Sequence, residues 1–446
     1  MSNAKNKQLF LPETNDGQAT RPASLPVQVD TPCPCCGNIT IPNGGDALAY
    51  ICPVCLWEID LFIQTEEEPS DQNHGLSLAQ CRKNYRSCGA VLPRLVKHSR
   101  PPEREELPLS WLPRKLLPWF EQNKRNLPWR ENRDPYRVWL SEIMLQQTRV
   151  EAVKGYYTRF LEALPTVQAL ADCPEEQLLK LWEGLGYYNR ARNLQKAAKI
   201  LAETGFPDSY EGWIALPGVG EYTAGAVASI CFDRPVAAVD GNVLRVLSRY
   251  RADDAPITDS AVKKRVKAEL EEIYPKEQPG AFTQALMELG ATVCVPNGAP
   301  KCEICPLSRQ CKAFLMGKTD DFPVKEAKKA RKTERKAVFL LRCGEKLALE
   351  KRPSRGLLAG LWQLPNVEGV LTETQAAAQA AQWGCEPHDL LSVRQKKHIF
   401  THITWEMTGY ELRCGREDPR FVWAAPEDLE KEYALPTAFR QFLEET

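Results

Sequence analysis

The chain has 446 residues, of which 58 are Lys or Arg and 58 are Asp or Glu, so its formal net charge at pH 7 is zero. This balance provides no overall attraction to nucleic acid, and any such partner has to be recognised by local clusters of charge. The sequence has no run of about 18 apolar residues, and its first ten residues, MSNAKNKQLF, lack the apolar core of a signal peptide. From these features we expect a cytoplasmic chain of about three domains that neither spans a membrane nor is exported.

Sixteen cysteines in a chain without an export signal favour metal or cluster ligation over disulfides. Seven lie between Cys33 and Cys88, four lie between Cys294 and Cys311, and the other five stand alone. Two separate metal-binding regions are therefore expected.

Residues 1–30 are polar and are expected to be a disordered lead, followed by a Cys-rich segment over 31–92. Two Cys-x2-Cys pairs, fifteen residues apart, have the spacing of a Zn ribbon. We predict a small zinc-ribbon-like module whose ligands are Cys33, Cys36, Cys52 and Cys55. Four further residues could replace one of these ligands, namely Cys35, His74, Cys81 and Cys88, and free thiols are the alternative.

Residues 93–112 are charged and punctuated by Pro, which predicts a linker, and residues 113–318 have a helical pattern. Asp134 followed by Pro135 predicts a helix over 135–145. Thr148 with Glu151 three residues later is typical of a capping box, so a second helix is expected to begin there. The stretch MLQQT between them is then a tight break.

Glu142 lies near the end of the first of these helices, in the apolar context VWLSEIML. A lone Glu is more often exposed, but a carboxyl among apolar side chains can have a raised pKa and serve as a general acid. Asp240, in AVDGNV, precedes another apolar-periodic helix and is a second candidate. Its simplest role would be that of an N-cap.

The stretch LPGVGEYTAG over 216–225 joins two predicted helices through a Gly-rich hairpin. Backbone N–H groups around Gly218 and Gly220 could bind a phosphate without reading a base, and a plain pair of helix caps is the alternative. The hairpin lacks the Lys-Ser or Lys-Thr pair of a P-loop. It is followed by Tyr222.

Four cysteines in the spacing C-x7-C-x2-C-x5-C can surround one compact centre. They are Cys294, Cys302, Cys305 and Cys311. From the residues alone, such a tetrathiolate set suits either Zn or a [4Fe–4S] cluster.

Seven Lys or Arg residues between Lys325 and Lys336 mark a second linker, over 319–336. The remainder, 337–446, opens with AVFLLRCGEKLALEKR, two apolar runs around Gly-Glu that predict a hairpin. Alanine-rich helical sequence follows near 374–383, so this domain is predicted to be mixed α/β.

Together these segments resemble the helix-hairpin-helix DNA glycosylases with an iron–sulfur loop, and within them the adenine DNA glycosylase (MutY) family. The resemblance covers roughly 113–446 and rests on segments in the family's order: LPWR, SEIMLQQT, EGLGYYNRARNL, LPGVGEYTAG, VDGNV, AFTQALMELGA and the Cys loop. It implies a monomer that hydrolytically removes adenine opposite 8-oxoguanine in double-stranded DNA, with a [4Fe–4S] cluster in the Cys loop. It also implies a Nudix-like C-terminal domain that recognises the lesion without hydrolysing it, because clustered Mg²⁺-binding glutamates are missing from TETQAAAQAAQWGC.

The resemblance also assigns roles to individual positions. Glu142 would protonate adenine and Asp240 would stabilise the cationic sugar, which gives the two opposite protonation states that this chemistry needs. Tyr222 stands where glycosylase–lyases of the endonuclease III type carry a Schiff-base lysine, so a monofunctional enzyme is expected. Such a lyase, or a catalytically silent DNA-binding scaffold, are the alternatives.

Other positions are expected to contact DNA. Gln147 matches the residue that enters the base stack, and Tyr187 matches the aromatic beside the oxidised guanine. Thr401 and His402, in FTHITW, are candidates for lesion contacts, although the family usually has Ser where Thr401 stands. The positions expected to line the adenine pocket are Trp129, Arg130 and Gln284.

The first gap in the Cys loop is seven residues where the family usually has six, which a wider loop around Asn297-Gly298 would accommodate. The N-terminal segment resembles the small CPCC cysteine-rich family. Partner docking, an additional DNA contact and stability alone are the roles open to it.

Overall fold

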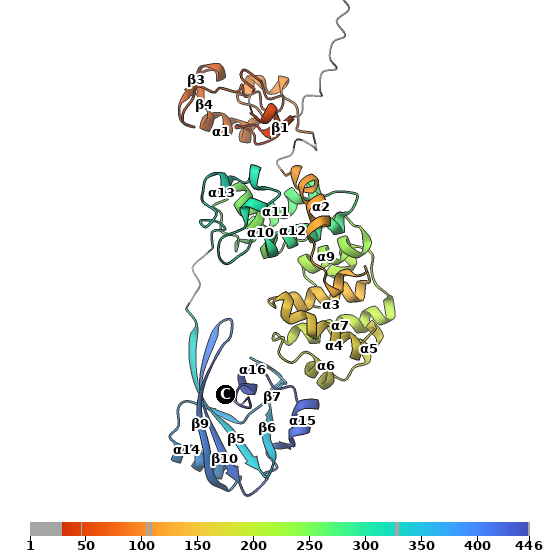
Figure 1. Cartoon of the computed structure of the whole chain (residues 1–446), viewed down its shortest axis with the longest axis vertical. Helices are drawn as coiled ribbons and strands as arrows, with labels where there is room; N and C mark the ends of the chain where they lie inside the picture. Colours follow the sequence, from red (N-terminus) through yellow and green to blue (C-terminus); the bar gives the residue numbers. More distant parts are fainter. Residues whose placement is uncertain (1–28, 46, 104–105, 107–108, 326–329, 445–446) are drawn as a thin grey trace, which may run out of the picture. The chain divides into compact units, whose positions relative to one another are not determined.

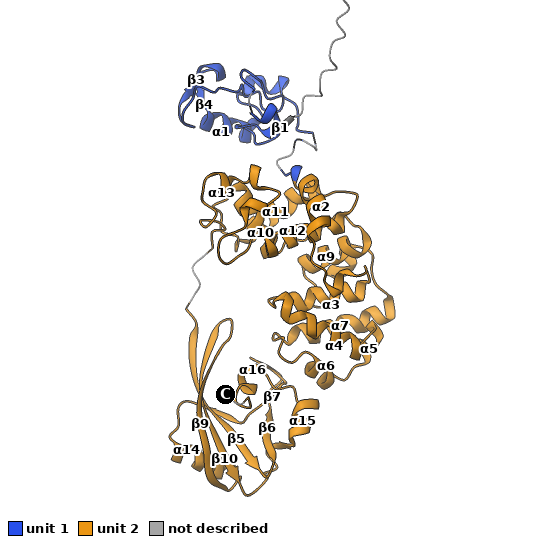
Figure 2. Cartoon of the chain, viewed as in Figure 1, with its two compact units in different colours: residues 1–111 blue, residues 112–446 orange. Residues whose placement is uncertain are grey.

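A computed structural model describes residues 29–444, apart from residues 46, 104–105, 107–108 and 326–329. The chain divides into two compact units, residues 1–111 and 112–446 (Figure 2). Most of the predicted disordered lead, residues 1–28, lies outside the described residues, and its last two residues open the first strand.

The N-terminal unit is built from very short strands and one α-helix around a Cys-rich core (Figure 1). Trp57 and Cys81 are fully buried in this core, and β1 pairs antiparallel with β2. Its elements are β1 (Val29–Pro32), β2 (Ile39–Pro42), η1 (Asn43–Gly45), β3 (Pro69–Ser70), η2 (Asp71–Asn73), β4 (Leu76–Ser77), α1 (Leu78–Cys88) and η3 (Pro93–His98).

The stretch predicted to be a linker, 93–112, begins with the 3-10 helix η3. Leu95 packs on the Cys-rich core, and the Arg100 N–H donates to the Pro53 carbonyl at 3.2 Å. The start of this stretch is therefore part of the N-terminal unit. This part does not form an extended linker, because an apolar residue between the charged ones, Leu95, packs against the Cys-rich core.

The helical part of the second unit supplies most of the candidate site. Its elements are α2 (Trp111–Asn123), η5 (Pro128–Arg130), α3 (Pro135–Leu145), α4 (Val150–Ala163), α5 (Val167–Asp172), α6 (Glu175–Leu181), α7 (Asn189–Thr204), α8 (Tyr210–Ile214), α9 (Glu221–Phe232), α10 (Gly241–Arg251), α11 (Ser260–Ile273), α12 (Pro279–Thr292), η6 (Cys302–Ile304), η7 (Ser308–Gln310) and α13 (Lys312–Leu315). Large buried aromatics such as Trp139, Trp182 and Trp213 fill the core between α3 to α9.

The predicted helix over 135–145 is confirmed, with Asp134 as its N-cap accepting from the Arg137 N–H at 2.9 Å. The predicted capping box at Thr148 is wrong. Helix α4 begins at Val150 with Arg149 as N-cap, and the Thr148 hydroxyl instead donates to the Gln146 carbonyl at 3.4 Å. The hydroxyl stabilises the tight break between the helices rather than the second helix itself.

The C-terminal part is a seven-stranded mixed sheet with helices (Figure 1). Five strands follow the order β11-β6-β5-β10-β9, where β10 runs parallel to β5 and antiparallel to β9. The other two strands lie off this path, with β7 paired to β6 and β8 paired to β5. The predicted hairpin and the predicted helix near 374–383 are both confirmed. The elements are β5 (Lys332–Cys343), β6 (Lys346–Lys351), β7 (Trp362–Gln363), β8 (Asn366–Glu368), α14 (Glu373–Gln382), β9 (Pro387–Ile399), β10 (Ile403–Cys414), β11 (Val422–Ala424), α15 (Pro426–Lys431) and α16 (Thr437–Arg440).

Strand β5 begins at Lys332, inside the stretch predicted as a basic linker. Its first residues pair with the start of β10, where Lys332 lies opposite Ile403. The last basic residues of that stretch are therefore held in the sheet.

Among the described residues, no helix combines the length and the apolar character that crossing a bilayer requires.

Candidate functional site

A cavity of 680 Å³ opens where α3, α9, α10 and α12 meet the short helix η5. Its lining includes Glu142 from α3, Tyr222 from α9 and Asp240 at the start of α10. The structure thus brings together three residues that are up to 98 positions apart in the sequence, Glu142 and Asp240 being the ends of that interval.

Glu142 is only 6% exposed and accepts a hydrogen bond from the Tyr222 hydroxyl, with 2.5 Å between the oxygens. Burial raises the pKa of the Glu142 carboxyl to about 7, the Tyr222 hydrogen bond opposes this rise, and the charge of Asp240 adds to it. Burial also keeps the pKa of Tyr222 well above its ordinary value, so the phenol stays a donor. A large share of Glu142 therefore carries a proton near neutral pH, as a general acid must.

Asp240 occupies the N-cap of α10 and faces polar partners. Its carboxylate accepts from the Val243 N–H at 2.8 Å and from the Asn242 side-chain amide at 2.6 Å. Burial raises its pKa, while these hydrogen bonds favour the ionised form. The two carboxyl groups of the cavity thus have different surroundings, one against a phenol and one at a helix N-terminus, where hydrogen bonds oppose the effect of burial on the pKa of Asp240.

The Gly-rich hairpin joins α8 to α9 as predicted. Gly218 has φ +75°, which favours glycine, and within the described part of the chain the N–H groups of Gly218 and Gly220 have no acceptor. A Cβ on Gly225 would lie 2.8 Å from the Ala237 carbonyl oxygen, so the small residue lets α9 approach the segment that leads to Asp240. The hairpin therefore presents free donors while its helix places Tyr222 in the cavity.

The three expected pocket residues, Trp129, Arg130 and Gln284, all line this cavity. The sequence interpretation missed their neighbour Glu288 on α12, which is 1% exposed and binds two arginines. Arg125 donates to it through Nε at 2.6 Å and Nη2 at 2.9 Å, and Arg130 donates through Nη2 at 2.8 Å. Burial opposes ionisation, but these arginines hold the pKa of Glu288 below its usual value.

The cavity lining also includes one amine, that of Lys263 on α11. The sequence interpretation had not considered this residue.

Gln147 and Tyr187 lie on two neighbouring loops and are both exposed. Both have left-handed backbone conformations, with φ of 59° and 46°, which non-glycine residues adopt rarely. Arg190 on α7 holds both loops, and its Nη1 donates to the Gln146 carbonyl at 2.7 Å while its Nη2 donates to the Gly186 carbonyl at 3.1 Å. Arg190 is the last residue of the motif LGYYNR, but the motif does not indicate which carbonyl groups the guanidinium binds.

Thr401 and His402 lie in the turn between β9 and β10 and line a second cavity, of 560 Å³. The Tyr187 hydroxyl and the Thr401 hydroxyl are 2.7 Å apart, so the two loops expected to contact the lesion meet. Gln147 also lines this cavity, and it lines the first cavity as well.

The four cysteines of the C-x7-C-x2-C-x5-C loop line a common cavity beside α10. No three of these four sulfurs lie within 4.8 Å of one another. One Zn would hold its thiolates about 3.8 Å apart, whereas a four-iron cube places each thiolate on its own iron. These four sulfurs are therefore not arranged as closely as the ligands of a single tetrathiolate Zn.

A chain of hydrogen bonds connects this loop to the cavity that contains Glu142 and Asp240. Asn242, which donates to Asp240, accepts from Arg245 Nη2 at 2.7 Å, and Arg245 Nε donates to the Cys294 carbonyl at 2.8 Å. Arg249 Nη1 lies 3.3 Å from the Cys294 sulfur. The Cys loop therefore supports the helix that carries Asp240.

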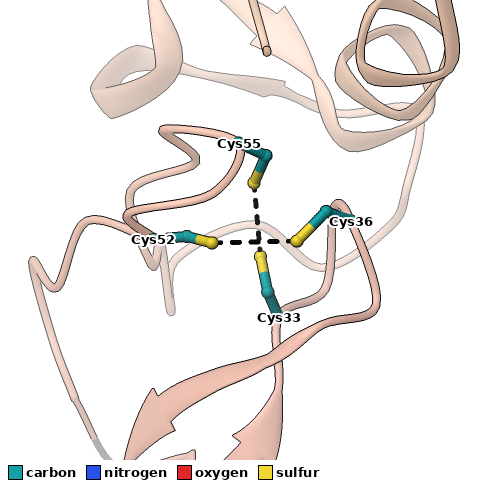
Figure 3. Close-up of side chains that lie close together, drawn as sticks. All are labelled: Cys33, Cys36, Cys52 and Cys55. Atoms are coloured by element: carbon teal, nitrogen blue, oxygen red, sulfur yellow. Dashed lines mark hydrogen bonds between the residues drawn. The ribbon is translucent and has the colours of Figure 1, made fainter. Parts of the chain in front are cut away.

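In the N-terminal unit the predicted ligands Cys33, Cys36, Cys52 and Cys55 point toward one another (Figure 3). All four sulfurs lie within 4.8 Å of one another, with 3.6 Å between Cys33 and Cys55 and 3.7 Å between Cys36 and Cys52. These separations match tetrahedral Zn–thiolate geometry, for which about 3.8 Å is expected. Four thiolates complete a tetrahedral Zn site, so none of the other candidates, Cys35, His74, Cys81 and Cys88, is needed as a ligand.

Comparison with known families assigns three segments. Residues 31–106 match the cysteine-rich CPCC family, residues 140–276 match the family described as HhH-GPD superfamily base excision DNA repair protein, and residues 337–445 match the NUDIX domain. The fold class expected from the sequence is thereby confirmed.

An adenine DNA glycosylase from Mus musculus is 37% identical over 358 residues, which cover 67% of this chain and 69% of that protein. An adenine DNA glycosylase from Arabidopsis thaliana is 36% identical over 366 residues, and the match spans 68% of this chain but only 58% of that longer protein. A solved structure of a non-covalent endonuclease III–DNA complex is 26% identical, with a TM-score of 0.40 over 47% of this chain and 96% of that one.

Proposed function

This chain belongs to the adenine DNA glycosylase family, and we propose that it removes adenine mispaired with 8-oxoguanine from double-stranded DNA. The observation that carries the proposal is that one cavity holds two carboxyl groups in different surroundings, the buried Glu142, whose pKa is raised to about 7, and Asp240, which accepts hydrogen bonds at the start of α10. Hydrolysis of an N-glycosidic bond needs both, because adenine leaves only when protonated and the sugar becomes cationic as it leaves.

In the proposed reaction Glu142 gives its proton to the adenine ring, and the bond between the base and the sugar C1′ breaks. Asp240 stabilises the resulting oxocarbenium-like sugar. Water then adds to C1′, its proton passes to a carboxylate, and free adenine and an abasic sugar result. Tyr222 holds the Glu142 carboxyl in position at 2.5 Å and, as a phenol, cannot form an imine with the sugar.

Adenine has to leave the helix before it can enter the cavity, which costs a few kcal/mol. We propose that Gln147 enters the stack in its place, since its exposed side chain adjoins both cavities. Tyr187, Thr401 and His402 would contact the oxidised guanine on the opposite strand. The hairpin donors at Gly218 and Gly220 would bind the backbone, and Trp129, Arg130 and Gln284 would enclose the base.

We also propose a [4Fe–4S] cluster on Cys294, Cys302, Cys305 and Cys311 and a Zn ion on the four N-terminal cysteines. Both would act structurally, by holding the loops whose backbone supports the neighbouring elements. None of the sixteen cysteines forms a disulfide, as suits a protein of the reducing cytoplasm. Because one chain supplies both carboxylates, the reaction requires only a monomer.

The test is single-turnover release of adenine from duplexes that carry adenine opposite 8-oxoguanine or opposite cytosine, with the enzyme in excess. Release should be fastest opposite 8-oxoguanine and should vanish in Glu142→Gln, while Glu162→Gln, an exposed residue at the end of α4, serves as a matched control. Duplex binding without release by the unmodified chain would instead support a DNA-binding scaffold.

A further inference from the structure

Charge is strongly segregated within the N-terminal unit. Residues 31–81 include seven Asp or Glu and no Lys or Arg, whereas residues 82–102 include six Lys or Arg and no Asp or Glu. A net charge of zero for the whole chain conceals this division. The basic half consists of helix α1, the 3-10 helix η3 and the residues that follow it.

Four of the six basic side chains are exposed and lack an ion-pair partner among the described residues: Lys83, Arg86, Arg94 and Lys97. Lys83 and Arg86 are three apart on α1, and Arg94 and Lys97 are three apart on η3, so each pair shares one face of its helix. We call these four residues the basic surface. Arg82 and Arg100 differ, because both are engaged by acidic residues of the same unit.

The opposite faces of these two helices are buried. Cys81 of α1 is fully buried and Leu95 of η3 packs on the same Cys-rich core. The side-chain amide of Asn84 donates to the Val91 carbonyl at 2.8 Å and so ties α1 to the chain just before η3. The basic surface is therefore carried by fixed elements and not by a loose tail.

The metal-binding pairs hold these elements at both ends. Arg82 Nε on α1 donates to the Pro34 carbonyl at 2.9 Å, between Cys33 and Cys36. On either side of η3, the Val91 N–H donates to the Cys55 carbonyl at 2.8 Å and the Arg100 N–H donates to the Pro53 carbonyl at 3.2 Å. A metal ion on the four cysteines would therefore help to hold the basic surface in place through these three hydrogen bonds.

We propose that the basic surface binds the phosphate backbone of DNA and gives this glycosylase a second, sequence-independent DNA contact in addition to that of its catalytic domain. The proposal rests on the proposed function for its ligand: a chain whose catalytic part binds duplex DNA holds a tethered cationic surface at high effective concentration near phosphates. Exposed Lys and Arg side chains that have no ion-pair partner among the described residues suit phosphate contacts, which release counterions and carry no sequence information.

The test compares the full-length chain with a variant in which all four residues are changed to Gln (Lys83→Gln, Arg86→Gln, Arg94→Gln, Lys97→Gln). The dissociation constant for an undamaged duplex is measured by fluorescence anisotropy over a series of salt concentrations. A charge-conserving variant (Lys83→Arg, Arg86→Lys, Arg94→Lys, Lys97→Arg) is the matched control. Because the side chains are exposed, both variants should keep the circular dichroism spectrum and zinc content of the parent.

Each phosphate contact contributes about 0.9 to the slope of log K against log salt, so the Gln variant should lose roughly two to four units of slope. It should also bind at least about tenfold more weakly at low salt, while the charge-conserving variant keeps the parent's slope. A second variant, Cys36→Ser with Cys52→Ser, should lower the slope in the same way if it remains folded, because the hydrogen bonds from the metal-binding pairs then lose their support.

An unchanged slope and affinity in the Gln variant would overturn the proposal. So would charge-dependent binding of poly-glutamate together with an unchanged DNA slope, since that result assigns the surface to an acidic protein. The rate of adenine release at saturating enzyme should be equal in the parent and the Gln variant. If the parent releases no adenine, the proposed function fails, but the salt slopes still decide whether this surface binds DNA.

Discussion

The Tyr222→Phe substitution tests the electrostatics of the cavity most closely. It removes the hydroxyl that donates to Glu142 at 2.5 Å and leaves the ring in place. A hydrogen bond to a charged group contributes about 1.5–3 kcal/mol, which corresponds to roughly one to two pKa units. Because this bond favours the ionised carboxylate, its loss should move the pKa of Glu142 upward from about 7.

The assay is the pH dependence of single-turnover adenine release with saturating enzyme. Above pH 7 the rate of the parent should fall about tenfold per pH unit as Glu142 ionises. In Tyr222→Phe the fall should begin one to two units later, so that near pH 9 the protonated fraction is about ten- to fifty-fold larger than in the parent. Tyr157→Phe is the control, because its buried hydroxyl has no partner among the described residues. If the fall in rate at high pH begins at the same pH as in the parent, or at a lower pH, this reasoning is refuted. The apparent pKa read from that fall belongs to the interacting pair Glu142 and Asp240 and not to Glu142 alone.

Three further outcomes are expected. The folded state raises the pKa of Glu142 from 4.5 to about 7, so the free energy of unfolding falls as the pH rises through that range. Glu142→Gln should therefore stabilise the fold by up to about 3 kcal/mol at pH 8 and by little at pH 4, as measured by thermal melting. Equal effects at the two pH values would contradict the raised pKa. Arg190→Lys cannot bind both loops at once and should reduce base flipping several-fold, seen as a smaller fluorescence rise of 2-aminopurine at the target position, with Arg192→Lys as control and an unchanged signal as the contrary result. Elemental analysis should find one Zn and about four Fe per chain, and Cys36→Ser should remove Zn alone; loss of Fe in that variant would show that the two centres are not separate.

Much of the local structure could be predicted because the signals were local. Asp134 and Pro135 announce α3, Asp240 announces α10, and the two Cys-x2-Cys pairs announce the N-terminal metal site. Each depends on residues within a few positions of one another, where backbone geometry decides the outcome. The capping box at Thr148 failed for a similar local reason, since α4 begins at Val150 with Arg149 as its N-cap, which leaves Thr148 one residue before the capping position.

The parts that were missed depend on contacts between distant segments. Glu288 lies in the otherwise apolar run AFTQALMELGA, a signal that could have been noticed, but its partners Arg125 and Arg130 are about 160 positions away. Arg190 binds carbonyls from two loops that no spacing rule brings together. Lys263 reaches the cavity from α11, whose sequence gives no indication of which helices it faces.

The hydrogen-bonded connection from Asp240 to Cys294 is a fourth example. Asn242 and Arg245 follow Asp240 closely on α10, and only packing against the Cys loop gives them their second partners. A cluster in that loop would therefore influence Asp240 through the helix that both adjoin, without taking part in the proposed reaction.

Borohydride trapping during turnover addresses the central claim most directly, because it distinguishes water from an amine as the group that captures the sugar. On a duplex with adenine opposite 8-oxoguanine, we expect free adenine and a strand that stays intact until heated in alkali, with no covalent protein–DNA adduct at the rate of base release. An adduct formed at that rate and abolished by Lys263→Gln, together with spontaneous strand breakage, would mean that the cavity works as a lyase and that its tyrosine and two carboxyls have been misassigned.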